Sequence, residues 1–135
     1  MKIRKDVVEE IIAHAKKEAP LEACGYLAQK NAVVLKHYAL TNMDHSEEHF
    51  SFDPREQFEA MRDARRQGFE VCTVYHSHPF TPARPSAEDI KLSIDPHLSY
   101  VVVSLAGAET DIKAFRIKGE RVEKEDLEVV SDDSL

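Results

Sequence analysis

The chain has 135 residues, of which 42% are apolar and 32% are charged, which is ordinary for a globular protein. A chain of this length is expected to form one domain around one core. Its formal net charge is −7, from 18 basic and 25 acidic side chains. This balance argues against nucleic acid as a partner, because proteins that bind a phosphate backbone present clustered positive charge.

The first ten residues, MKIRKDVVEE, are charged, and polar residues interrupt the apolar ones that follow. This pattern lacks the apolar core of a signal peptide, and no later run reaches membrane-spanning length. Cys24 and Cys72 are too few for a disulfide framework, although the sequence leaves open one disulfide between them. We therefore expect a cytoplasmic protein without a membrane segment.

The N-terminal part of the chain predicts a helix and two strands. Residues 3–19 carry apolar side chains at helical spacing, and Pro20 marks the end of the pattern. The segments 22–29 and 31–38 predict two strands joined by a tight turn. Residues 39–52 are polar and are expected to be irregular.

A second helix is predicted to begin after Asp53, because an N-cap residue is followed there by Pro54 at the first helical position. Gly68 ends this helix, and residues 69–76 then alternate as a strand whose last residue is His76.

Ser86 is predicted to cap a short helix that runs to about Leu92. Residues 99–105 form the most apolar segment and predict a central strand buried on both faces. The segments on either side of Gly119, up to residue 130, predict a closing hairpin. The expected fold is a single α+β domain over residues 1–130, with a mixed β-sheet flanked by helices and a frayed tail at 131–135.

The segment YHSHPFTPARPSAED (residues 75–89) contains His76 and His78 at the end of a predicted strand. In an extended backbone, residues two apart point to the same face, roughly 6.5 Å from each other. Two imidazoles so placed can bind one cation, each about 2.0–2.1 Å from a zinc ion. The intervening Ser77 would point away from it.

A zinc ion that catalyses a reaction needs a third protein ligand and keeps its fourth position for water. Asp89 is the nearest candidate, because Ser86 begins a helix and Asp89 lies in its first turn. Prolines 79, 82 and 85 restrict the connection between the histidines and this helix. Two nitrogens and one oxygen suit zinc, although iron and manganese also fit such a set.

Each of these residues also has an explanation without a metal. A histidine pair is often a surface coincidence, and a serine followed three residues later by an acid is a common helix start. The motif must therefore be judged as a whole.

The segment HSHPFTPARPSAED resembles, without a gap, the signature of the JAMM (MPN+) metalloprotease family: H-x-H, seven residues, then S-x-x-D. PLEACGYL (residues 20–27) resembles the upstream segment that carries the family's catalytic glutamate. The order of the predicted elements also agrees, so the resemblance covers roughly residues 1–118. It implies the cytidine-deaminase-like fold of that family.

The resemblance further implies a zinc ion held by His76, His78 and Asp89. It implies that Glu22 is the general acid and base of a peptidase, and that the hydroxyl of Ser86 assists the oxyanion. Without the family, Glu22 would be read as a solvated residue at the start of a strand.

Members of this family cut peptide or isopeptide bonds next to ubiquitin-like proteins. The short chain is similar to the small stand-alone prokaryotic members, which are linked to ubiquitin-like sulfur carriers. We therefore expect a sulfur-carrier protein as the substrate. The sequence does not indicate an oligomeric state.

Three alternatives remain at this point. The fold also serves as a non-catalytic scaffold, although such relatives usually lack part of the metal set. Cys24 could be a thiol nucleophile, but a role in buried packing is favoured for it. A structural zinc would need a fourth ligand, such as Cys72, which is expected on the same strand face as His76 but roughly 13 Å away.

Overall fold

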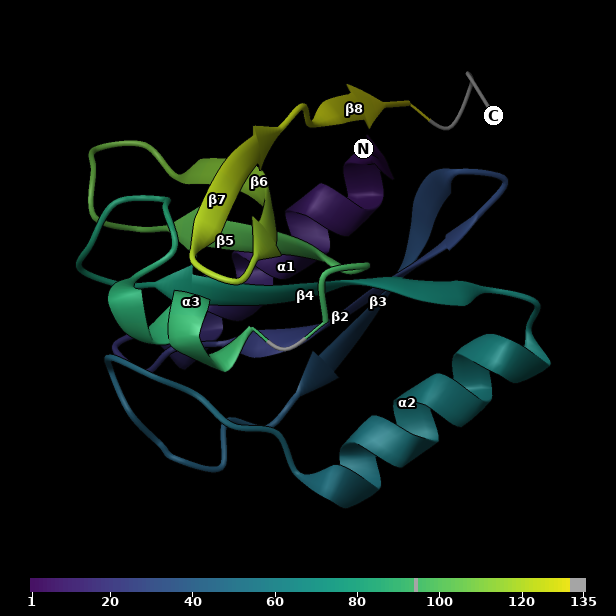
Figure 1. The fold of residues 1–135 in the computed structure, drawn as a ribbon, viewed down its shortest axis with the longest axis horizontal. Coiled ribbons are helices and arrows are strands. Elements are labelled where there is room, and N and C mark those ends of the chain that lie inside the picture. The colour runs from purple at the N-terminus through teal and green to yellow at the C-terminus, as the bar shows by residue number, and fades with distance from the viewer. Residues whose placement is uncertain (94, 132–135) are drawn as a thin grey trace.

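The computed structural model describes residues 1–93 and 95–131 (Figure 1). The helices lie between strands in the first part of the chain and the last part contains only strands, an order that fits an α+β fold. Their order is β1 (Lys2–Arg4), α1 (Lys5–Glu18), β2 (Cys24–Lys30), β3 (Val33–Leu40), α2 (Pro54–Arg66), β4 (Glu70–His78), α3 (Ala87–Leu92), β5 (Ser99–Ser104), β6 (Asp111–Lys118), β7 (Arg121–Glu125) and β8 (Glu128–Val130).

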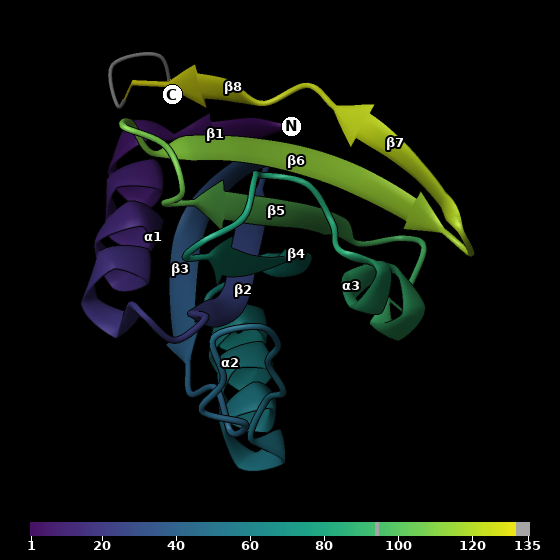
Figure 2. The ribbon, with the colours of Figure 1, turned by 90° about the vertical axis from the view of Figure 1, so that its left-hand side faces the viewer.

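All the strands belong to one mixed sheet with the order β7-β6-β5-β4-β2-β3-β1-β8. The β1–β3, β1–β8 and β4–β5 pairs are parallel, and the others are antiparallel. Strands β7 and β8 lie at opposite ends of this order although only residues 126 and 127 separate them in sequence. The sheet must therefore curl on itself, and Figure 2 shows β7 leading directly into β8 along its upper rim.

The two faces of the sheet carry separate apolar clusters. Helix α1 covers one face because Val7, Ile11 and Ala15 repeat at helical spacing and are fully buried there, with Tyr75 of β4 in the same cluster. Helix α2 lies on another side of the molecule (Figure 2) and contributes Ala60 to the second cluster. Strand β4 therefore runs between two packed layers.

The single mixed α+β domain is confirmed, as are the predicted helices and most of the strands. Strand β5 lies between β4 and β6, and all six of its residues are buried, as the apolar run 99–105 predicted. Asp53 caps α2 with its side chain, and Pro54 opens that helix. No helix in the described part of the chain is long and apolar enough to cross a membrane.

The strand predicted to end at His76 continues to His78, and two further boundaries were predicted wrongly because of long-range pairing. The first helix begins at Lys5 rather than at residue 3, because residues 2–4 pair as β1 with both β3 and β8. The second arm of the predicted closing hairpin is divided. Only residues 121–125 pair with β6, whereas 128–130 cross to β1, where the amide of Glu128 donates to the carbonyl of Met1.

The proposed limit of the domain at residue 130 coincides with the end of β8. Of the predicted tail 131–135, residues 132–135 lie outside the described residues.

Gly25 lies where three chain segments approach closely. A Cβ atom built there would be 2.1 Å from the carbonyl oxygen of Tyr38 and 2.6 Å from Cε1 of Tyr75. Both neighbours belong to strands that pair with β2, so neither can move aside without disturbing the sheet.

We expect Gly25→Ala to lower the free energy of unfolding by at least about 1–3 kcal/mol, because it overpacks a filled core. Gly107→Ala is the matched control, since its new Cβ would meet no atom closer than 3.5 Å. Urea unfolding measures both variants. Equal midpoints for the two would contradict this account.

Candidate active site

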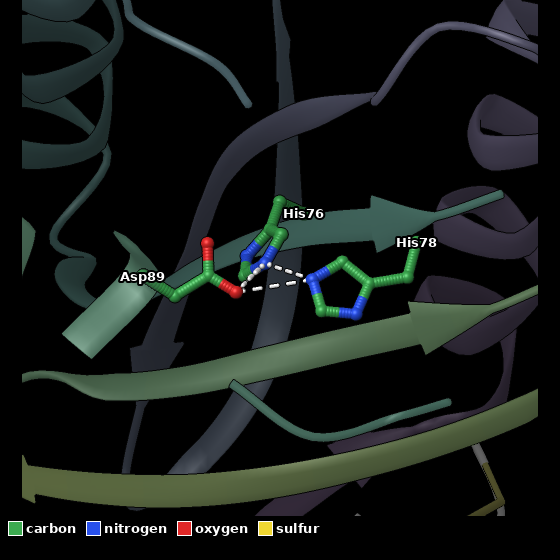
Figure 3. A group of neighbouring side chains, drawn as sticks. All are labelled: His76, His78 and Asp89. Atoms are coloured by element: carbon green, nitrogen blue, oxygen red, sulfur yellow. Dashed lines mark hydrogen bonds and ion pairs between the residues drawn. The ribbon is translucent and has the colours of Figure 1, made fainter. Parts of the chain in front are cut away.

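The two histidines of the H-x-H motif lie at the C-terminal end of β4. The strand extends to His78, so both rings are held by regular pairing with β5, in the register His76↔Val102 and His78↔Ser104. Both residues are buried, and their Nε2 atoms are 3.0 Å apart. Figure 3 shows the two rings converging on the same point.

Asp89 reaches the same point from α3 (Figure 3). Its Oδ2 atom is 3.0 Å from Nε2 of His76 and 3.0 Å from Nε2 of His78. The predicted cap is present: Ser86 Oγ accepts a hydrogen bond from the Asp89 amide, and the Ser86 amide donates to Asp89 Oδ2 at 2.8 Å. A capping box therefore sets the direction of the carboxylate.

The proline-containing loop also holds His78 directly. Nδ1 of His78 is 2.9 Å from the carbonyl oxygen of Pro82. A carbonyl oxygen can only accept, so Nδ1 carries a proton, and Nε2 of the neutral ring presents a lone pair. This lone pair faces the carboxylate of Asp89, so neutral His78 and ionised Asp89 need a positive charge between them.

The shifts in pKa reflect the same requirement. Burial lowers the pKa of His78, but the hydrogen bonds with Asp89 and Pro82 outweigh burial, so the pKa is raised overall. Burial raises the pKa of Asp89, but hydrogen bonds from His76 and His78 outweigh it and lower the pKa. The carboxylate is thus kept ionised beside the two imidazole rings.

These three atoms fit a metal ion. Ligand atoms that share one tetrahedral zinc at about 2.0–2.1 Å lie roughly 3.3 Å from each other, close to the 3.0 Å separations seen here. Within residues 1–93 and 95–131, this is the group of histidine and acidic side chains that could hold a metal ion. The described geometry therefore brings together the three residues of the predicted metal set.

Glu22 is buried beside this group, with 2% of its surface exposed. Strands β2 and β4 pair Cys24 with His76, and Ser77 exchanges hydrogen bonds with Ala23 just beyond that pair. Continued by one more residue, this antiparallel register sets Glu22 opposite His78, on the same face of the sheet.

The carboxyl group of Glu22 is unusual because one of its oxygens is buried and unpaired in the described part of the chain. Among the described residues, its Oε1 atom is buried without a hydrogen bond. Burial raises the pKa of Glu22 to about 8. The charge of His78 opposes this rise in pKa, and the charge of Asp89 adds to it. The alternative interpretation of Glu22 as a solvated residue at the start of a strand is therefore wrong.

Two residues near the site were missed by the sequence reasoning. Asn42 is buried, and its side-chain amide donates to the carbonyls of Glu22 and His49, which ties the 42–51 loop to the start of β2. The ring of Phe50 then stacks on His76 with centroids 4.9 Å apart. The Asx turn from Asn42 to Asp44 is a recognisable local signal, whereas the contact of Phe50 with His76 is purely tertiary.

Neither cysteine belongs to the group of side chains that could hold a metal ion, and both are free thiols. Burial raises the pKa of Cys24 to about 12, which argues against a thiolate nucleophile. Cys72 was expected on the same face as His76, and this is wrong. The register shifts between Leu27 and Ala28, which leaves Cys72 opposite no residue of β2, and it packs on the face covered by α1. It cannot supply a fourth ligand.

Comparison with known proteins agrees with this geometry. Residues 4–118 match the family described as prokaryotic homologs of the JAB domain. The CysO-cysteine peptidase of Mycobacterium tuberculosis is 34% identical over 131 residues, which cover 95% of this chain and 90% of the relative. A probable TtuB-protein conjugate cleaving protease of Thermus thermophilus is 34% identical over 90 residues, 66% of this chain and 60% of that protein.

Solved structures agree as well. The solution structure of a Desulfitobacterium hafniense protein is similar with a TM-score of 0.90 and 43% identity, over 98% of this chain and 94% of that one. A JAB1/MPN domain protein from Archaeoglobus fulgidus gives a TM-score of 0.68 at 27% identity, over 96% and 99% of the two chains. The chain belongs to the prokaryotic JAB-domain family, and its relatives include small stand-alone JAMM-type peptidases.

We expect Asp89→Asn to lower zinc affinity by at least about 100-fold, since even outer-shell changes at metal sites cost 10- to 100-fold. The substitution keeps the side chain's size and an oxygen for the Ser86 amide, so the helix start should be retained. Metal content after dialysis, read by mass spectrometry, and the circular dichroism spectrum measure the two effects. Asp111→Asn, at an exposed acid on β6, is the control. Zinc retained at wild-type affinity by Asp89→Asn would exclude this carboxylate as a ligand.

Proposed function

We propose that the protein is a zinc-dependent peptidase that hydrolyses a peptide or isopeptide bond at the C-terminus of a ubiquitin-like sulfur-carrier protein. One observation carries the chemistry. Glu22 is buried, with its Oε1 atom unpaired among residues 1–93 and 95–131, and lies opposite His78, which contributes one of three ligand atoms that are mutually 3.0 Å apart. The names of the relatives, a peptidase for CysO-cysteine and a protease for TtuB conjugates, support the substrate class.

His76, His78 and Asp89 would hold the zinc ion. When bound, zinc supplies a Lewis acid and lowers the pKa of water toward 7. The chain prepares this position in advance, because the capping box fixes Asp89 and the Pro82 carbonyl fixes the tautomer of His78. Only three ligands are present in this group, as a catalytic rather than a closed structural site requires.

Glu22 is proposed as the general base and acid. Its Oε1 atom takes a proton from the attacking water and later gives it to the leaving amine. A carboxyl group exchanges protons best when its pKa lies near the working pH, and burial raises the pKa of Glu22 to about 8. Its lack of a hydrogen-bond partner within the described residues leaves Oε1 available for water.

Ser86 is proposed to stabilise the oxyanion. Its Oγ atom accepts from the Asp89 amide, and this contact uses a lone pair rather than the hydroxyl proton. The proton can therefore be donated to the developing negative charge on the substrate.

A non-catalytic scaffold is less well supported. A scaffold has no use for a buried carboxyl group without a partner, which costs stability. Such a carboxyl group beside a group of metal-ligating atoms is expected in an active site, where groups needed for catalysis are kept although they lower stability.

We expect Glu22→Gln to abolish cleavage while zinc content is unchanged, because the amide keeps the shape but cannot carry the proton. Cleavage of a sulfur carrier with a C-terminal extension is followed by intact mass, and zinc by mass spectrometry. Glu48→Gln, at an exposed acid of the neighbouring loop, is the matched control. Unchanged turnover in Glu22→Gln would remove Glu22 from the mechanism.

We expect Ser86→Gly to lower the rate constant of cleavage by about 100- to 1,000-fold, as for the loss of one oxyanion donor. Glycine replaces serine as an N-cap at a cost of only a few tenths of a kcal/mol, so loss of the helix cannot explain such a fall. Ser86→Thr keeps both the hydroxyl and the cap and should retain most activity. Equal rates in Ser86→Gly and wild type would refute this role.

A further inference from the structure

An apolar groove adjoins the candidate metal ligands and is not used by the mechanism above. Its volume is about 420 Å³, and His76 and Asp89 form part of its wall. We propose that this groove is the specificity pocket of the peptidase and receives a large apolar side chain of the substrate next to the scissile bond. This inference rests on the proposed function and deepens it by defining a substrate class.

The position of the groove ties its occupant to the reaction centre. Phe50 lines the groove and at the same time stacks on the ring of His76, with centroids 4.9 Å apart. A side chain that fills the groove therefore lies against the ring of His76, one of the two rings that face Asp89 in Figure 3. The residue so bound must be close to the bond that is cut.

The walls of the groove are chemically suited to an apolar side chain. Aromatic and aliphatic residues from β2, the 50–52 loop, α2, α3 and β5 line it: Tyr26, Phe50, Phe52, Met61, Leu92 and Tyr100. Its volume is within the roughly 300–1,000 Å³ of small-molecule pockets, which is far more than a glycine or an alanine side chain would fill.

Two of the tyrosine hydroxyls in the wall are already paired within the protein. Gln57 Nε2 donates to the Tyr26 hydroxyl at 2.8 Å, and the Tyr100 hydroxyl donates to the carbonyl of Asp95 at 3.2 Å. An apolar occupant would leave these two hydrogen bonds intact. In the described part of the wall, Nδ1 of His76 is buried without a hydrogen-bond partner, so a polar occupant would find few free groups to pair with.

Charge further narrows the class of occupant. Glu88, Asp89 and Asp95 line the groove, and none of its described lining residues is a lysine or an arginine. A carboxylate side chain would meet like charges in a partly desolvated site. The groove should therefore select large apolar residues and reject acidic ones.

The groove is also open to a partner. Met61 on α2 and Leu92 on α3 form parts of its rim and are 47% and 58% exposed. Both side chains are therefore free to contact a ligand in the groove. Their exposure also makes them safe to truncate, because little of the core depends on them.

The test compares wild type with the double variant Met61→Ala/Leu92→Ala. Phe58→Ala is the matched control, since Phe58 is 65% exposed on the same helix as Met61 but does not line the groove. The substrate is a ubiquitin-like sulfur carrier with a short C-terminal extension. The residues just before and just after the scissile bond are changed separately to Phe, Leu, Gly or Glu.

At one of these two positions, we expect kcat/KM for Phe to exceed that for Gly by about 10- to 100-fold, with Glu cleaved most slowly. The double variant should reduce the Phe/Gly ratio by about 10-fold, and Phe58→Ala should leave the ratio unchanged. Phe/Gly ratios near one at both positions, or a ratio insensitive to the double variant, would overturn the proposal.

A binding measurement separates this proposal from the proposed activity. The protein contains no tryptophan, so the fluorescence of a short capped glycine peptide with a central Trp reports only the ligand. We expect a blue shift on adding zinc-loaded Glu22→Gln, weakened about 10-fold in affinity by the added double variant but not by Phe58→Ala. If no carrier is cleaved but this shift occurs, the proposed peptidase activity is refuted and the proposed role of the groove is supported.

No shift, or a shift unaffected by the double variant, would refute the groove whether or not carriers are cleaved. A second copy of this chain is the competing occupant. Sedimentation that shows a wild-type dimer and a monomeric double variant would assign the groove to self-association and overturn the proposal.

Discussion

One carboxylate oxygen holds the candidate site together. Oδ2 of Asp89 accepts from the backbone amide of Ser86 at 2.8 Å and lies 3.0 Å from each of two imidazole nitrogens. The amide belongs to a helix start, where donors are free and acidic groups are favoured. The carboxylate is therefore aimed by local backbone geometry, while its charge is balanced by groups that come from a strand.

The sheet supplies the other constraint, and it explains why some features could be predicted and others could not. Local signals located the helix of Asp53, the cap at Ser86 and the apolar strand 99–104, because each depends on residues close in sequence. Strands β1 and β8 have only three residues each and carry no periodicity. They exist because they pair with each other and because β1 also pairs with β3, which no local pattern reveals.

The residues of the candidate site also fall into those placed by local sequence and those placed by long-range strand pairing. The spacing of His76, His78 and Asp89 follows from one strand end and one helix turn, so the sequence alone could bring them together. Glu22 comes from another strand, and only the register Cys24↔His76 sets it opposite His78. A bulge that the sequence does not announce moves Cys72 to the other face. Pairing over long distances therefore decides which of the many acidic and thiol side chains belong to the site.

Strand β4 is held from its far face as well, which makes its end a rigid platform. Tyr75 points to the opposite face of β4 from its neighbours Val74 and His76, and its ring packs in the apolar cluster covered by α1. Its hydroxyl is 2.7 Å from His14 Nδ1 and 2.5 Å from His37 Nε2. A single hydroxyl proton can serve only one of these nitrogens, so the other ring must donate its own proton to the Tyr75 oxygen. Helix α1, strand β3 and strand β4 are thereby joined behind His76. The ring of His76 belongs both to the candidate metal site and to the proposed substrate groove, so both need this ring to stay in place. The hydrogen bonds of Tyr75 on the opposite face of β4 therefore support both proposed functions.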